Sequence, residues 1–292
     1  MLRLKLLSAI LLGVLLLPLA GARVGPSAPV TVRVLTYNIH HGEGRDGELD
    51  LLRLADVMRS LQPDVIALQE VDRGTQRAGG VDQLTELAAL LGMHAEYGKS
   101  MDFAGGAYGV AILSRWSLAS SANRPLPASP DHEPRTALTV RFRAGRDGPW
   151  VRFTSTHLDN SRDAAERLAQ AQYLNDLLAT EDGDASILAG DFNARPGTDV
   201  IQVLEQGWMN ALPDSTPLAP TIPADAPPAP TPTPTDTTLP ARPPFAQRRG
   251  PRGDFVLFRP AHLWRVIESR TIDESVASDH RPVLTMLEFI GG

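Results

Sequence analysis

Five short polar motifs in this chain carry residue types that can bind a metal ion, move a proton or hold an anion. They are TYNIHHG, ALQEVDR, STHLDN, LAGDFNARP and SVASDHRP. Each lies at the end of an apolar run, or just ahead of one, that predicts a β-strand, so carboxylate, amide and imidazole groups recur at strand ends. A single motif of this kind is commonly a polar turn or a surface acid. Five of them together indicate a functional site.

The motif nearest the C-terminus, SVASDHRP, sets Ser278, Asp279 and His280 side by side ahead of a proline. These residue types fit a nucleophile with its base, half of a metal site, or a polar turn before the last strand. The chain has no GxSxG elbow, which a serine hydrolase of the α/β type would need. Three adjacent residues of an extended segment also cannot all converge on one point. We therefore interpret Ser278 as a turn residue or a helper of the acid.

The first two motifs lie at the ends of the two strands in a predicted strand–helix–strand unit. Residues 30–38 alternate β-branched and polar types and predict a strand that ends near Asn38. Residues 51–61 have helical spacing of apolar residues, with Asp50 as the N-cap and Pro63 as the stop. The apolar run DVIALQE then predicts a buried strand that ends at Glu70. Open sheets place their ligands at such strand ends.

The rest of the chain alternates further helices and strands. We expect a second helix capped by Asp82 and closed by Gly92, a long helix with Ser161 as its N-cap, and a short helix after Thr198. The predicted strands are YGVAILSR, RTALTVRF, WVRFTSTHL, SILAGDFN, GDFVLFRP, LWRVIESR and VLTMLEF. Because many strands follow one another directly, this order favours a layered α/β sandwich with mixed or antiparallel sheets over a purely parallel sheet.

Composition limits the classes of function. The 292 residues are 42% hydrophobic and 21% charged, which is typical of a globular chain with a large core. The net charge of -6 gives no overall basic surface and disfavours a dedicated nucleic-acid binder. It does not exclude a nuclease, because a metal at a local site can supply positive charge. The absence of cysteine excludes disulfides, thiolate zinc sites and cysteine nucleophiles.

Two segments stand apart from the globular pattern. Residues 1–22 combine Arg3 and Lys5, an apolar run, and small residues at Ala20 and Ala22, which is typical of a cleaved export signal. The run is shorter than the roughly 20 residues that a bilayer span needs, which favours a cleaved signal over an uncleaved anchor. We therefore expect one domain over residues 23–292, secreted or periplasmic. Residues 212–244 hold 12 of the 25 prolines and predict an extended surface insert in this domain.

In combination and in order, the motifs resemble the endonuclease/exonuclease/phosphatase superfamily of metal-dependent phosphoesterases. This superfamily contains pancreatic-type deoxyribonucleases, abasic-site endonucleases, neutral sphingomyelinases and inositol polyphosphate phosphatases. GDFN and SDH carry the resemblance most strongly, followed by LQE, and it runs from about residue 31 to 289 apart from the insert. It implies a four-layered α/β/β/α sandwich with two mixed, largely antiparallel sheets packed face to face.

The resemblance also implies a Mg²⁺ site, which Mn²⁺ could fill as well. Glu70 would be the main ligand, with the amide oxygen of Asn38 beside it. Asp279 would lie near the metal from the other side, directly or through water. Oxygen ligands of this kind are those that Mg²⁺ prefers.

The remaining implied roles concern the attacking water and the phosphoryl group. His280 would face the phosphorus beside Asp254, and would abstract a proton from water or assist Asp191, which positions that water. Asn193 and His157 would donate hydrogen bonds to the phosphoryl oxygens. Gly253 departs from the β-branched residue that the family usually has before this Asp.

Four further residues are candidates for substrate contact, and three of them have an alternative interpretation. Arg135 and Asn160 are candidates for phosphate contact, but Arg135 suits equally well an ion pair with Glu133. The adjacent His40 and His41 would line the substrate entrance or lie in an exposed polar loop.

We therefore expect an exported Mg²⁺-dependent phosphoesterase, and more specifically a phosphodiesterase. TYNIHHG and GGAYGVAILSR resemble a compact branch with bacterial exported proteins and the lumenal domain of a protein that remodels the lipid of glycosylphosphatidylinositol anchors. This implies a phospholipid or inositol-phosphate-like substrate. The alternatives are a secreted endonuclease or exonuclease acting on nucleic acid, and an inactive binding module of the same fold. We expect a monomer with no obligate protein partner.

Overall fold

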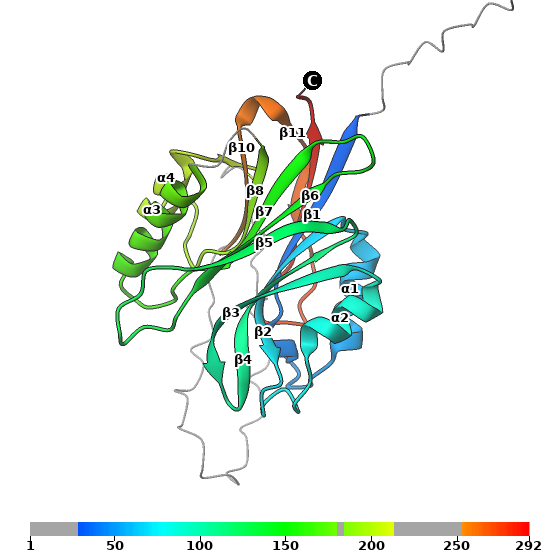
Figure 1. Ribbon diagram of the computed structural model, residues 1–292. Coiled ribbons are helices and arrows are strands. Elements are labelled where there is room, and N and C mark those ends of the chain that lie inside the picture. The colour runs from blue at the N-terminus through cyan, green and yellow to red at the C-terminus, as the bar shows by residue number, and fades with distance from the viewer. Residues whose placement is uncertain (1–28, 180–183, 213–252, 292) are drawn as a thin grey trace, which may run out of the picture.

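The computed structural model describes residues 29–179, 184–212 and 253–291 (Figure 1). The predicted export signal (1–22) and the predicted Pro-rich insert beyond Leu212 lie outside the described residues. Within the described ranges, no helix is both long and apolar enough to cross a membrane.

Two six-stranded sheets form the centre of the described chain. The first sheet has, in spatial order, β11 (Trp264–Thr271), β12 (Val283–Phe289), β1 (Val30–Asn38), β2 (Val65–Arg73), β4 (Gly106–Ser114) and β3 (His94–Phe103). The second has β5 (Leu118–Pro125), β6 (Thr136–Arg143), β7 (Trp150–His157), β8 (Ala185–Asp191), β10 (Asp254–Arg259) and β9 (Met209–Asn210). Strands β1 and β2 pair in parallel, as do β7 and β8, and the other pairs are antiparallel.

Helices cover the outer face of each sheet, as Figure 1 shows on its two sides. The helices are α1 (Leu51–Leu61), α2 (Gln83–Leu91), α3 (Ala165–Ala179) and α4 (Asp199–Glu205), with the short 3₁₀ helices η1 (His40–Gly42) and η2 (Ala261–Leu263). Apolar residues of both sheets, such as Val34 and Phe153, share one buried cluster. Two further clusters lie between the first sheet and α1–α2, and between the second sheet and α3–α4. The predicted four-layered sandwich is confirmed.

The predicted ends of the first two helices are confirmed. Asp50 accepts a hydrogen bond from the Arg53 amide at 2.9 Å, and Asp82 accepts one from the Thr85 amide at 3.1 Å. Gly92 ends α2 in the left-handed conformation, with a φ of 65°. Each bond satisfies a backbone donor that the first helical turn leaves without an intrahelical partner.

The predicted N-cap of the long helix is wrong. Helix α3 begins at Ala165, whose amide donates to the Asp163 carboxylate at 3.0 Å. Ser161 belongs to the preceding turn, where its amide donates to Asp159 at 2.8 Å. Ser161 is therefore bound to Asp159 in the turn, and Asp163, two residues before Ala165, accepts the hydrogen bond at the start of the helix.

Candidate active site

Parallel pairing brings the first two motifs to one edge of the first sheet. Asn38 ends β1 and lies opposite Gln69 of β2. The last strand, β12, runs antiparallel to β1, and its first residue Val283 lies opposite Thr36. The loop that carries His280 therefore reaches the same edge.

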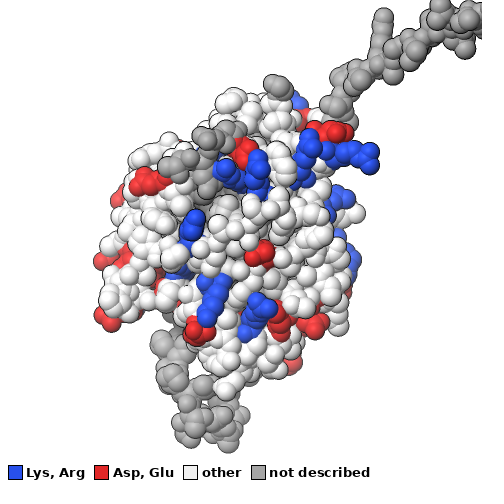
Figure 2. Space-filling view, viewed as in Figure 1, with Lys and Arg blue, Asp and Glu red and all other residues white. Residues whose placement is uncertain are grey.

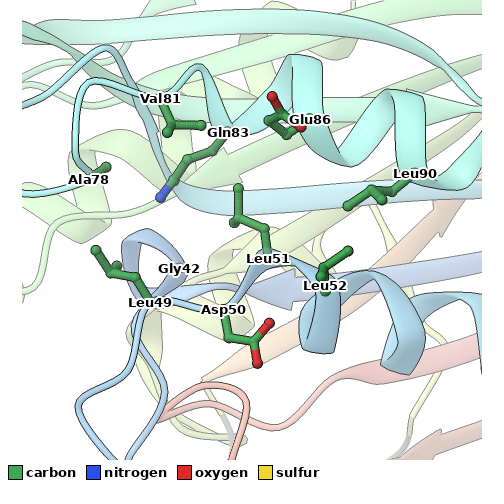
Figure 3. Close-up of a pocket in the computed structure, with 10 residues that line it drawn as sticks. All are labelled: Gly42, Leu49, Asp50, Leu51, Leu52, Ala78, Val81, Gln83, Glu86 and Leu90. Carbon is green, nitrogen blue, oxygen red and sulfur yellow. The ribbon is translucent and has the colours of Figure 1, made fainter.

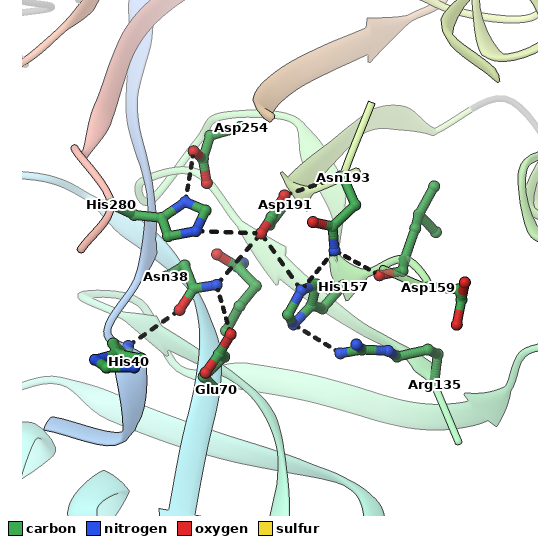
Figure 4. Close-up of polar contacts among 12 residues, drawn as sticks. Asn38, His40, Glu70, Arg135, His157, Asp159, Asp191, Asn193, Asp254 and His280 are labelled. Carbon is green, nitrogen blue, oxygen red and sulfur yellow. Dashed lines mark hydrogen bonds and ion pairs between the residues drawn. The ribbon is translucent and has the colours of Figure 1, made fainter. Parts of the chain in front are cut away.

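Strand pairing also brings three predicted site residues to one edge of the second sheet. His157 ends β7 and lies opposite Asp191, which ends the parallel strand β8. Asp254 begins β10 and lies opposite Asp191 from the other side. The two edges face each other, because the Asn38 amide donates to Asp191 Oδ2 across the sheets at 3.3 Å. Figure 4 shows these side chains converging from both sheets.

A β-bulge directs Glu70 into this cluster. Leu68 and Val71 of β2 lie opposite Ala111 and Gly109 of β4, so β2 carries one extra residue here. Glu70 has a φ of 58°, a left-handed backbone that non-glycine residues rarely adopt. Such bulges and strained residues cluster at functional sites, where they re-aim a side chain.

The Glu70 carboxylate is ionised and partly open. Burial alone would raise its pKa, but the charges of His157 and His40 and the hydrogen bond from Asn38 lower the pKa of Glu70 to about 2. The Asn38 amide donates to Oε1 at 3.1 Å. The charge and the donor together keep the carboxylate in the form that a cation needs.

Asn38 is oriented differently from the expectation. Its amide nitrogen faces Glu70 and Asp191, and its oxygen accepts a hydrogen bond from the His40 amide at 3.0 Å. Turning the amide around would set its oxygen against two carboxylates, which is electrostatically unfavourable. The oxygen predicted to lie beside the metal thus points to the η1 turn.

His280 lies between two buried acids. Its Nδ1 is 3.0 Å from Asp254 Oδ2, and its Nε2 is 3.6 Å from Asp191 Oδ2. Burial opposes the charged ring, but the charges of Asp254 and Asp191 outweigh it and raise the pKa of His280 well above its usual range. Burial raises the pKa of Asp254, whereas the charge of His280 and contacts with His157 hold the pKa of Asp191 well below its usual range despite burial. A charged imidazole beside an ionised Asp191 is the favoured arrangement.

The GDFN turn holds the side chains of Asp191 and Asn193 close to His157. Asn193 has a φ of 48°, and its amide donates to Asp191 Oδ1 at 2.9 Å. Its side-chain nitrogen donates to the Leu158 carbonyl at 2.9 Å and lies 2.9 Å from His157 Nε2. The turn therefore holds Asn193 directly between the ends of β7 and β8.

Arg135 contacts His157 from the side opposite Asn193. The Arg135 guanidinium lies 2.9 Å from His157 Nδ1. A guanidinium can only donate, and so can the Asn193 side-chain nitrogen 2.9 Å from Nε2, so a neutral His157 ring accepts from one of these two donors. His157 Nε2 also lies 3.3 Å from Asp191 Oδ2. Arg135 also pairs with Glu133 at 3.1 Å, so the predicted ion pair is present, whereas the phosphate contact stays a prediction. Asn160 follows in the loop after β7 and is exposed.

In the SVASDHRP segment, Ser278 has a structural role that is distinct from the position of His280 between the acids. The Ser278 hydroxyl donates to the Asn38 carbonyl at 2.7 Å and accepts from the His280 amide at 3.2 Å. It therefore ties the loop to β1, in keeping with a turn residue. Asp279 is half-buried, with its Oδ1 3.5 Å from the Ser278 hydroxyl.

Tyr108 is a site neighbour that the sequence interpretation missed. It is buried in β4, and burial followed by the charge of Glu70 raises its pKa well above the usual range. The charge of Arg135 opposes this rise in the pKa of Tyr108. The only sequence signal was a polar aromatic residue at the start of an apolar strand. His41, for which an exposed loop was one reading, is 5% exposed and thus buried.

The donor set fits a divalent cation with oxygen ligands. Glu70 supplies an ionised carboxylate, and among the described residues its Oε2 has no hydrogen-bond partner. Asp191 and Asp254 add carboxylate oxygens that, with a His280 nitrogen, all lie within 4.8 Å of one another. Hard cations such as Mg²⁺ prefer such oxygens.

An apolar pocket of about 350 Å³ lies between α1 and α2 (Figure 3), and none of its lining residues belongs to the acid–histidine cluster. Gly42 of the η1 turn lines it, together with Leu51 and Gln83. Leu49 and Leu52 also line it and are 48% and 64% exposed. The pocket thus sets exposed apolar surface next to the turn that follows Asn38.

The sequence profile described as "Endonuclease/Exonuclease/phosphatase family" matches residues 35–280. YbhP, an uncharacterised protein of Escherichia coli strain K12, is 27% identical over 171 residues, which cover 55% of this chain and 66% of YbhP. The chain therefore spans slightly less than two thirds of that relative.

Solved structures share the fold. An endonuclease/exonuclease/phosphatase from Beutenbergia cavernae aligns with a TM-score of 0.68 and 23% identity, covering 89% of this chain and 72% of that one. The mannosyl-6-phosphatase Bt3783 of Bacteroides thetaiotaomicron aligns with a TM-score of 0.64 and 18% identity, covering 88% of this chain and 100% of that one.

Proposed function

Because the chain belongs to the endonuclease/exonuclease/phosphatase family, whose members are hydrolases of phosphoester bonds, we propose that it is an exported Mg²⁺-dependent phosphodiesterase. One observation carries the proposal. Glu70, Asp191 and His280 come from three separate motifs and meet at the facing edges of the two sheets. They supply a cation ligand, a water-orienting carboxylate and a charged imidazole in one place.

The acids and His280 act on the attacking water and the phosphoryl group. Asp191, ionised and 3.6 Å from His280 Nε2, orients the attacking water and accepts its proton, while the charged His280 ring beside it stabilises the negative charge that develops on the phosphoryl group. Asp254 holds the ring through Nδ1 and stabilises its charge. A divalent cation bound at Glu70 would supply neutralisation of charge on the phosphoryl and leaving oxygens.

Three donors on the β7–β8 side stabilise the negative charge of the transition state. His157 Nε2 lies 3.3 Å from Asp191 Oδ2 and donates from there when the ring is protonated on that nitrogen. The Asn193 side-chain amide lies within 2.9 Å of that nitrogen. Arg135 is 3% exposed and adds a fixed positive charge behind His157. Donors held in place before the reaction need no reorganisation during it, which is where such sites gain most of their rate.

The first experiment measures hydrolysis of bis-p-nitrophenyl phosphate by the purified protein, with Mg²⁺ or with chelator. We expect activity with Mg²⁺, loss with chelator, and loss in His280→Ala with its thermal unfolding temperature largely retained. Equal activity with chelator, or full activity in His280→Ala, contradicts the proposal. No activity on any phosphoester would instead favour a binding module of the same fold.

We propose a phospholipid or inositol-phosphate-like phosphodiester as the substrate. The exposed Leu49 and Leu52 beside the pocket suit the apolar part of a lipid. On the face shown in Figure 2, basic side chains are separated by acidic and uncharged ones, which disfavours a long duplex there. Assays on phosphatidylinositol, sphingomyelin and plasmid DNA test this, and cleavage of DNA alone would assign a nuclease.

A further inference from the structure

We propose that His40, His41 and Glu43 form a second metal site, for a divalent transition metal such as Zn²⁺. One potential ligand atom from each residue lies within 4.8 Å of the other two. The three residues belong to the η1 turn and its end, and the proposed hydrolysis assigns them no step. The site therefore stands whether or not the hydrolysis is confirmed.

His40 is already held in the tautomer that a metal ligand needs. Its Nδ1 lies 3.1 Å from the Glu43 carbonyl oxygen. A carbonyl can only accept, so the proton of the neutral ring resides on Nδ1 and the lone pair on Nε2. Histidines that bind metals through one nitrogen usually donate the other N–H to a carbonyl or carboxylate in this way.

The separation of His41 and Glu43 matches two ligands of one ion. His41 Nε2 is 3.4 Å from Glu43 Oε2, longer than a good N–H···O hydrogen bond. Two ligands that each lie about 2.0–2.1 Å from a tetrahedral Zn²⁺ are about 3.3–3.4 Å apart. The most separated pair of the three would need to approach by at most about 1.4 Å to reach that geometry.

His41 is buried with unused capacity. It is 5% exposed, and its Nδ1 has no hydrogen-bond partner among the described residues. An ion on Nε2 would place the ring proton on Nδ1, so the ion would set the tautomer of His41 without supplying a partner for Nδ1. Glu43, whose side chain is 41% exposed, opens the cluster to an ion from solvent.

The turn holds both rings in place at a cost in backbone strain. His40 and His41 have φ values of 47° and 44°, which are unfavourable for any residue with a β-carbon. The Gln83 side chain donates to the His41 carbonyl at 2.6 Å and secures this conformation. Strain of this kind persists where the surroundings impose it, commonly at sites that clamp a ligand.

Ligand chemistry separates this site from the one at Glu70. Two imidazoles and one carboxylate suit Zn²⁺ and related ions, whereas Mg²⁺ prefers oxygen ligands alone. The sites are nevertheless linked, because the His40 amide donates to the Asn38 side chain at 3.0 Å. An ion on His40 would therefore also restrain Asn38 beside the catalytic acids.

The test titrates metal-stripped protein with Co²⁺ in a large excess of Mg²⁺ and follows visible absorption, which reports nitrogen-ligated Co²⁺. We expect one equivalent of bound Co²⁺ that Zn²⁺ displaces. His41→Ala and Glu43→Gln should each weaken binding by at least about tenfold, since even outer partners of metal ligands cost about 10–100-fold. Glu70→Gln should bind Co²⁺ like the wild type.

His262→Ala is the matched control, because His262 is exposed in η2 and lies outside the cluster. Its Co²⁺ affinity should equal that of the wild type. If His41→Ala unfolds, Glu43→Gln decides, because its side chain is partly exposed and its loss leaves the turn intact. Wild-type affinity in Glu43→Gln, or loss of the Co²⁺ signal in Glu70→Gln, would overturn the proposal.

Discussion

Asp254→Asn removes one charge from the centre of the candidate site and leaves the shape of the side chain unchanged. Asp254 is 1% exposed, and its Oδ2 lies 3.0 Å from His280 Nδ1. Asparagine can still accept a hydrogen bond there, but it no longer stabilises the charged ring. The change therefore isolates the electrostatic role of this acid.

The structure sets the size of the expected effect. Two unit charges 3.0 Å apart interact by roughly 5–6 kcal/mol at an effective dielectric constant of about 20, before the cost of burying them. After that cost, a hydrogen bond to a charged group is worth about 1.5–3 kcal/mol. If the charged ring stabilises the transition state, kcat should fall by about 10- to 150-fold, with KM nearly unchanged.

The pH profile gives a second readout with a defined sign. Asp254 and Asp191 raise the pKa of His280 in the wild type, so the charged ring persists to higher pH than for a free histidine. Without Asp254 this pKa falls, and the charged ring is lost at lower pH. The alkaline limb of the kcat profile should therefore move to lower pH in Asp254→Asn.

Asp64→Asn is the matched control. Asp64 is also buried and ion-paired, to Arg115 at 2.6 Å, but it precedes β2 on the side away from the bulge. It should lower the thermal unfolding temperature without changing kcat or the pH profile on bis-p-nitrophenyl phosphate. An unchanged kcat in Asp254→Asn, or an equal loss in both variants, would refute the reasoning.

Three further outcomes are expected. Glu70→Gln should abolish the rise in unfolding temperature that Mg²⁺ gives the wild type, because Glu70 is the ionised ligand; a rise of equal size would contradict this assignment. Asp50→Ala should cost about 1 kcal/mol in urea unfolding, since it removes the N-cap of α1, and a change near zero would show that the cap is dispensable. Despite burial, hydrogen bonds from Ser161 lower the pKa of Asp159, so its contribution to stability is present above about pH 4 and lost as pH falls further. The stability difference between wild type and Asp159→Asn should therefore shrink from pH 5 to pH 3, and a constant difference would argue against it.

The sequence predicted that several motifs would lie close together, because the ends of apolar strands can be recognised in it. Asn38, His157 and Asp191 each close such a strand, and parallel pairing brings their ends together. The contact between Asp254 and His280 is different, because these residues belong to distant strands. Only the family resemblance suggested it, and the structure places them 3.0 Å apart.

The bulge in β2 and the strands β3 and β5 could not be predicted from a sequence pattern. DVIALQE predicts a strand that ends at Glu70, whereas β2 continues to Arg73 through the bulge. Apolar periodicity is the same on both sides of such an insertion, so a bulge cannot be predicted from the pattern of apolar residues. Strands β3 and β5 were not predicted, because most of their residues are exposed or half-buried and lack an apolar face.

The pairing of β1 with β12 makes the candidate site depend on both ends of the described chain. Seven residue pairs, from Val30 with Phe289 to Thr36 with Val283, join the start of the described chain to its end. A nascent chain released before β12 would expose the edge of β1 and lack His280 altogether. Contacts this distant in sequence slow folding and leave unpaired edges open to aggregation meanwhile. The candidate site would therefore be complete only after the last strand has paired with the first.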